Sequence, residues 1–148
     1  MKMGKIPRIL YVEDSLEDIE LTLAAFAECN LANGIDVVHD GEEALDYLFY
    51  RGTYSNREKS APAFVLLDIK MPKLDGVEVL KIIRQSREYE TLPVVMLTSS
   101  KMETDIMQSY KLGANGFVIK PIDFTDFVKA IKGIGYFWAI INVSPLNL

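Results

Sequence analysis

The chain has 148 residues, 49% of them hydrophobic, which is enough for one compact domain and not comfortably for two. Its formal net charge of −5, with no run of Lys or Arg, argues against a nucleic-acid-binding surface, which needs a basic patch. No segment approaches the ~18 consecutive apolar residues of a membrane-spanning helix, and the N-terminal apolar run is too short for a signal peptide, so we expect a cytoplasmic protein.

Short apolar runs predict five strands along the chain: ILYV 9–12, IDVV 35–38, FVLL 64–67, VVML 94–97 and FVI 117–119. Between them, apolar residues recur at three- and four-residue spacing, which predicts helices around 19–26, 44–49 and 77–83. Asp75 and Asp123 are plausible N-caps of helices. The polar, turn-rich segment 51–62 precedes the third strand and is interpreted as an insertion.

The strands are continuously apolar rather than alternating, which is typical of a parallel sheet covered by helices on both faces. We therefore predict an α/β fold, a flavodoxin-like doubly wound sheet of five parallel strands in the order 2-1-3-4-5. An extended C-terminal helix follows the last strand.

Polar side chains follow the strands that lie at the centre of that order. Ligands of open parallel sheets bind outside the carboxyl ends of the strands. Glu13 and Asp14 follow the first strand, Asp68 the third, Thr98 the fourth and Lys120 the fifth. The sequence thus predicts three acids, a hydroxyl and an ammonium group at one rim of the sheet.

Crowded carboxylates repel one another unless a counter-charge is present, and Mg²⁺ prefers oxygen ligands of this kind. We expect Asp14 and Asp68 to bind Mg²⁺ directly, Glu13 directly or through water, and the backbone carbonyl of Lys70 to add an oxygen. Mn²⁺ or Ca²⁺ are possible substitutes. Lys120 and Thr98 suit the oxygens of a phosphoryl group, which makes Asp68 the predicted phosphoacceptor.

Each residue alone has a simpler explanation, since an acid at a strand end is usually a cap and a lone lysine usually lies on the surface. Their joint occurrence at four strand ends favours the functional reading. A flavin-binding protein would need a phosphate-binding loop where this chain has EDSLED, which repels phosphate. An aspartyl phosphatase of the haloacid-dehalogenase type would place its two acids on the first strand. Flavin absorbance and turnover of phosphomonoesters discriminate these two classes.

Four segments resemble the motifs of receiver domains, the response-regulator modules of two-component signalling: YVEDS, LLDIKMPKLDG, VVMLTSS and FVIKPI. The resemblance covers residues 8 to about 132. It implies that Asp68 takes a phosphoryl group from a histidine kinase, that Glu13 and Asp14 hold the metal, and that Thr98 and Lys120 sense the acyl phosphate. It also implies a cis Lys120–Pro121 peptide and an aromatic switch at Phe117.

The resemblance further implies a phosphoacceptor that assists only its own phosphoryl transfer and hydrolysis, and not an enzyme. The alternative is a degenerate receiver that binds its partner without phosphorylation, and the intact acid set argues against it. The 51–62 insertion and the aromatic tail are similar to the single-domain regulators that partner phytochrome-type kinases in bacteria.

Residues 1–148 are expected to form one receiver domain without an output domain, so that the signal passes by contact with another, unknown protein. One apolar stripe of the last helix is expected to cover the sheet: Phe124, Phe127, Val128, Ile131, Ile134, Trp138 and Ile141. Tyr136, Phe137 and Ile140 form a second apolar face. This second face predicts a homodimer, with a partner protein's surface as the alternative.

Overall fold

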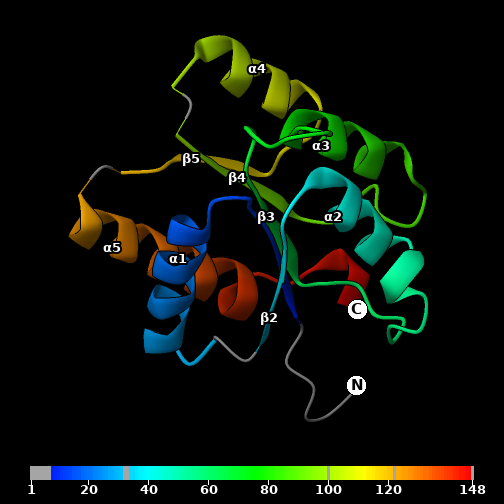
Figure 1. Ribbon diagram of the computed structural model, residues 1–148, viewed down its shortest axis with the longest axis horizontal. Helices are drawn as coiled ribbons and strands as arrows, with labels where there is room; N and C mark the ends of the chain where they lie inside the picture. Colours follow the sequence, from blue (N-terminus) through cyan, green and yellow to red (C-terminus); the bar gives the residue numbers. More distant parts are fainter. Residues whose placement is uncertain (1–7, 32–33, 100, 122, 148) are drawn as a thin grey trace.

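The computed structural model describes residues 8–31, 34–99, 101–121 and 123–147. Strands and helices alternate along the chain (Figure 1): β1 Ile9–Val12, α1 Leu16–Glu28, β2 Ile35–Val38, α2 Gly41–Leu48, β3 Phe64–Leu67, α3 Gly76–Gln85, β4 Val94–Thr98, α4 Glu103–Lys111, β5 Gly116–Ile119 and α5 Phe124–Gly135. All neighbouring strands are parallel, in the order β2-β1-β3-β4-β5. This confirms the predicted fold class.

Helices cover the sheet on both sides. On one face α1 and α5 lie side by side, and Phe26, Phe127 and Ile131 pack there with Tyr11 and Phe64 of the strands. On the other face α2 and α3 bury a second cluster against the alternate strand residues. Because successive strand residues point to opposite faces, each continuous apolar run serves both layers.

Burial on both faces holds for the central strands but not for the edges, which corrects the sequence-based expectation. Every residue of β1, β3 and β4 is buried. The inner residues of β2 and all four residues of β5 are only partly buried. The physical reason is position, since an edge strand has a neighbour on one side only.

Helix α5 ends in an unusual way. Residues Tyr136–Ile141 continue it as a π-helix, in which the Asn142 N–H donates to the Phe137 carbonyl at 2.7 Å. Of the predicted stripe, Phe127, Ile131 and Ile134 are buried and Trp138 packs against Phe64, with ring centroids 6.5 Å apart.

Phe124 and Ile141 were wrongly predicted to cover the sheet, because they are 57% and 53% exposed. Phe124 is the first residue of α5 and borders a surface groove beside Lys120 instead of the sheet. Ile141 lies at the end of the π-helix, whose wider turn rotates later side chains away from the stripe. Tyr136, Phe137 and Ile140 are exposed, as predicted.

The C-terminal segment then passes to the opposite face of the sheet. Ser144 is buried, and Leu146, within the short 3₁₀ turn Pro145–Asn147, packs against the cluster under α2 and α3. In Figure 1 this red segment lies beside the end of α2. The tail therefore contacts both apolar clusters.

The 51–62 insertion is held to α2 by several contacts, and one arginine makes a large share of them. The Arg57 guanidinium stacks over the rings of Tyr47 and Tyr50, 4.0 and 4.4 Å from their centroids. Its Nε also donates to the Tyr47 carbonyl at 3.0 Å. These contacts make the insertion an ordered part of the domain. No helix in the described ranges combines the length and apolar character needed to span a bilayer.

Candidate functional site

The three predicted acids meet at the carboxyl end of the sheet. Val12 and Leu67 are opposite each other in the parallel register of β1 and β3, so Glu13 and Asp68 leave the sheet side by side. One carboxylate oxygen from each of Glu13, Asp14 and Asp68 lies within 4.8 Å of the others. Glu13 and Asp68 are buried, whereas Asp14 is exposed. The cluster is therefore open to solvent on one side and able to admit an ion.

Backbone contacts fix the position of Asp68. Its N–H donates to the Val12 carbonyl at 3.1 Å, and its Oδ1 accepts from the Ile69 N–H at 2.8 Å. Helix α3 begins directly against this turn, where the Gly76 N–H donates to the Ile69 carbonyl at 2.9 Å. Asp75 and Glu78 start the helix with a capping box, which confirms the predicted N-cap.

Position 76 is expected to be sensitive to substitution of its glycine by any larger residue. A Cβ at Gly76 would lie 2.1 Å from the Asp68 carbonyl oxygen, which is backbone and cannot rotate away. We expect Gly76→Ala to destabilise the fold by about 1–3 kcal/mol, measured by urea denaturation, because the helix or the Asp68 turn must shift. Gly133→Ala is the matched control, since a Cβ there meets nothing within 4 Å. Equal stability of the two variants would contradict close packing of α3 against Asp68.

Lys120 reaches the same cluster from the end of β5. Its Nζ lies 2.5 Å from Glu13 Oε1, 2.8 Å from Asp18 Oδ2 and 3.7 Å from Asp68 Oδ2. Burial alone lowers the pKa of Lys120, but the hydrogen bonds to Asp18 and Glu13 outweigh it and leave that pKa raised. Lys120 is thus a fixed positive charge at the site.

Glu13 carries the strongest electrostatic perturbation among the acids. Burial and a hydrogen bond shared with Asp68 raise the pKa of Glu13 to about 8, although Lys120 acts in the opposite direction. The Tyr11 hydroxyl donates to Glu13 Oε1 at 3.3 Å. Negative charge therefore exceeds the positive charge that Lys120 supplies, and a divalent cation fits this oxygen-rich set.

Asp18 was missed by the sequence analysis. Ser15 is the N-cap of α1 and accepts from the Asp18 N–H at 3.3 Å, so Asp18 has an ordinary place in the first helical turn. The available signal was its place in the first turn of the helix that directly follows Glu13 and Asp14, which keeps it near the rim.

The other predicted residues surround the cluster. Thr98 is buried at the end of β4, and its carbonyl accepts from the Lys120 N–H at 2.7 Å. Phe117 of β5 is partly buried against the cluster under α2 and α3. The Lys120–Pro121 peptide is trans, so the predicted cis bond is wrong; trans is the form that an X–Pro bond favours by about 0.5–1 kcal/mol.

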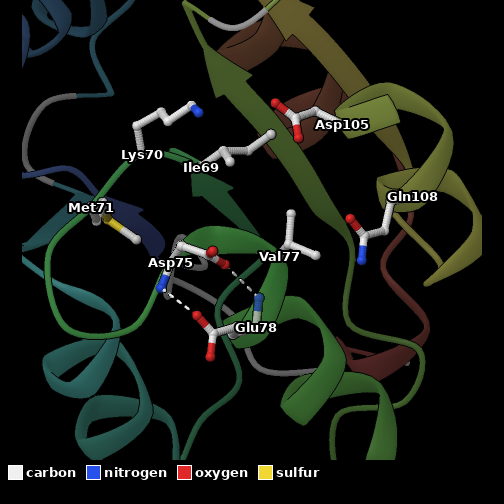
Figure 2. Close-up of a pocket in the computed structure, with 8 residues that line it drawn as sticks. All are labelled: Ile69, Lys70, Met71, Asp75, Val77, Glu78, Asp105 and Gln108. Carbon is white, nitrogen blue, oxygen red and sulfur yellow. Dashed lines mark hydrogen bonds between the residues drawn. The ribbon is translucent and has the colours of Figure 1, made fainter. Parts of the chain in front are cut away.

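A groove of about 380 Å³ lies next to the site, between the β3–α3 loop and α4 (Figure 2). Lys70 lines it, but the three clustered acids do not. Three acids line the groove, and Figure 2 shows that two of them, Asp75 and Glu78, each accept a hydrogen bond from the other's backbone N–H at the start of α3. These two serve the helix cap, and the lining, Asp105 included, lacks the clustered acids and Lys120, so the predicted chemistry belongs to the rim cluster and not to this groove.

Comparison with known proteins agrees with this geometry. Residues 9–132 match the family described as response regulator receiver domain. The chain belongs to this family. Receiver domains take phosphate from histidine kinases and bind divalent metal, and they are signalling phosphoacceptors rather than classical enzymes.

Three relatives are phytochrome-associated or closely similar receivers. Response regulator Rcp1 of Synechocystis is 36% identical over 130 residues, covering 88% of this chain and 87% of its own length. The phosphorylated cyanobacterial phytochrome response regulator RcpA has a TM-score of 0.88 at 35% identity, covering 95% of this chain and 99% of its own. The bacteriophytochrome response regulator AtBRR has 51% identity and a TM-score of 0.75, with 95% and 100% covered.

These similarities identify a two-component response regulator. They do not favour a degenerate receiver, which was the alternative reading of the sequence. The chain retains the acids, the hydroxyl and the lysine at the rim, as described above.

Proposed function

We propose that Asp68 accepts a phosphoryl group from a histidine kinase in a Mg²⁺-dependent reaction. The observation that carries this proposal is the position of Asp68, a buried carboxylate 3.7 Å from the Lys120 ammonium and within 4.8 Å of two further acids. In the transfer, an oxygen of Asp68 forms a bond to phosphorus. The bond from phosphorus to the kinase imidazole nitrogen breaks, and its electron pair stays on that nitrogen.

The residues at the rim have complementary roles in this step. Asp14 and Asp68, Glu13 directly or through water, and the Lys70 carbonyl would hold Mg²⁺, with Mn²⁺ or Ca²⁺ as substitutes. The ion would neutralise charge on the phosphoryl oxygens. The Mn²⁺-bound form of Rcp1, 34% identical with a TM-score of 0.84 and covering 94% of this chain and 99% of its own, supports a divalent ion here. Lys120 and Thr98 would bind phosphoryl oxygens by charge and hydrogen bond.

Labelling with acetyl phosphate tests the proposal. The protein should gain one phosphoryl group per chain in Mg²⁺ and none in EDTA, as measured by intact mass spectrometry. Borohydride reduction and peptide mapping should place the group on Asp68. A label on any other residue, or equal labelling in EDTA, would contradict the assignment.

We infer that the kinase is of the phytochrome type, because RcpA and AtBRR are described as phytochrome or bacteriophytochrome regulators. Phosphotransfer profiling against the histidine kinases of the source organism tests this assignment. Output passes by contact with another protein, and Phe117 would act as the switch that couples the phosphoryl site to the surface. We place the protein in the cytoplasm, in the same compartment as the histidine kinase proposed to phosphorylate it.

The exposed face of the tail supports a homodimer as part of the proposal. Tyr136, Phe137 and Ile140 are 55%, 45% and 53% exposed and adjacent to one another in the π-helix. Burying several hundred Å² of apolar surface contributes roughly 25 cal/mol per Å² before the cost of association. A two-fold pair is the commonest arrangement for one self-complementary patch.

Phe137→Asp should shift the protein towards monomer in sedimentation velocity, because pairing would force a charge into the apolar interface. Labelling of Asp68 should persist. Met107→Asp, which adds the same charge at an exposed apolar residue of α4, is the control and should leave the mass unchanged. A wild-type monomer at high micromolar concentration, with and without a phosphoryl analogue, would leave the tail as a docking site for another protein.

A further inference from the structure

Lys120 has a second carboxylate partner that the phosphoacceptor assignment does not explain. Asp18 lies on α1, 102 residues from Lys120 in sequence, yet their side chains are joined by a 2.8 Å hydrogen bond. We propose that Asp18 is a positioning residue that holds the Lys120 ammonium away from Asp68 in the unphosphorylated protein. This inference rests on the proposed function of Asp68.

The distances show which contacts Lys120 makes. Its Nζ is within hydrogen-bond range of Glu13 and Asp18, at 2.5 and 2.8 Å, but stands 3.7 Å from Asp68 Oδ2. The third distance exceeds the usual range of about 2.7–3.2 Å for such bonds. To contact a phosphoryl group carried by Asp68, the ammonium must move towards Asp68 and loosen one of its two short bonds.

The hydrogen bond between Lys120 and Glu13 is the more costly of the two to break. The Glu13 side chain is 1% exposed, so water cannot take the place of the Lys120 ammonium at that carboxyl group. Breaking a buried pair in this way is strongly unfavourable. The Tyr11 hydroxyl, itself hydrogen-bonded to Thr22 at 3.1 Å, also holds Glu13 in place.

The hydrogen bond between Lys120 and Asp18 is the easier of the two to break. The Asp18 side chain is 31% exposed. Asp18 and Lys120 both line an open groove of about 450 Å³ between α1 and the start of α5. Water can therefore replace the ammonium at the Asp18 carboxylate as Lys120 moves.

An interaction made in the unphosphorylated state and lost in the phosphorylated state opposes phosphorylation by its own free energy. Partly exposed ion pairs have modest strength, which corresponds to a change of about two- to fivefold in an equilibrium constant. Asp18 thus lowers the equilibrium constant for contact between Lys120 and the phosphoryl group.

The test measures binding of beryllofluoride, a phosphoryl analogue, to the full chain at saturating Mg²⁺ by isothermal titration calorimetry. Asp18→Asn should bind beryllofluoride about two- to fivefold more tightly than wild type. Asp18→Glu keeps the charge and should restore the wild-type affinity within about twofold. The matched control is Glu17→Gln, because Glu17 precedes Asp18 on α1 and is not one of the described carboxylates within 4.0 Å of Lys120 Nζ.

Mg²⁺ affinity without beryllofluoride is the second readout. A purely structural role of Asp18 would displace α1 and Asp14, and would weaken Mg²⁺ binding more in Asp18→Asn than in Glu17→Gln. Equal Mg²⁺ affinity of the two variants supports positioning. Unchanged or weaker beryllofluoride binding by Asp18→Asn, or equal tightening by Glu17→Gln, overturns the proposed role of Asp18 and leaves the phosphoacceptor proposal standing. Failure of the wild type to bind beryllofluoride overturns the phosphoacceptor proposal and this inference with it.

Discussion

Asp68→Asn is expected to reduce Mg²⁺-dependent labelling by acetyl phosphate below detection. A side-chain amide does not form the acyl phosphate, and Glu13, the other buried acid of the cluster, is already paired with Lys120 at 2.5 Å. The fold should survive, because Asn has nearly the same shape and its amide oxygen can still accept from the Ile69 N–H. Intact mass spectrometry measures the label, and urea denaturation confirms the fold.

Asp75→Asn is the matched control for this experiment. Asp75 follows the same strand, but its side chain serves the N-cap of α3, a position where Asn and Asp are equally favoured. The Asp75→Asn variant should be labelled by acetyl phosphate to the same extent as wild type. Undiminished labelling of Asp68→Asn in a folded protein would place the acceptor elsewhere.

Asp14→Asn is expected to weaken Mg²⁺ binding by about 10- to 100-fold, since even residues that only orient metal ligands contribute this much. Asp14 is exposed, so the amide needs no repacking. The same change should raise the denaturation midpoint of the metal-free protein, because it removes a charge from a set of three acids whose oxygens lie within 4.8 Å of one another. Calorimetric titration with Mg²⁺ and urea denaturation in EDTA measure the two effects.

Glu20→Gln removes one charge from an exposed position on α1. It should change neither the Mg²⁺ affinity nor the denaturation midpoint in EDTA appreciably. It separates the local effect of Asp14 from the effect of net charge. A lower midpoint for Asp14→Asn in EDTA would mean that the three carboxylates do not repel one another as their positions indicate.

The strands could be predicted from sequence because buried parallel strands have uninterrupted apolar side chains. The runs 9–12, 35–38 and 64–67 coincide with β1, β2 and β3, while β4 extends to Thr98 and β5 begins at Gly116. The strand-end positions of Glu13 and Asp68 followed from this topology, since parallel strands present their carboxyl ends at one edge.

Other features depend on geometry that spacing does not encode. The π-helix at Tyr136–Ile141 changes which side chains share a face, so Ile141 left the predicted stripe. Nothing in the sequence around Lys120 points to Asp18, because their contact depends on how α1 lies against the end of β5. The partial exposure of β5 reflects its edge position rather than its composition.

The C-terminal segment has a consequence for how the domain opens. Trp138 packs on the α1–α5 face and Leu146 on the α2–α3 face, so one short stretch of chain depends on both layers being formed. Regions that open independently exchange their amide hydrogens at separate rates. A segment anchored to both layers ties their local openings together, so that amides on the two faces of the sheet exchange as one cooperative unit while the tail stays docked.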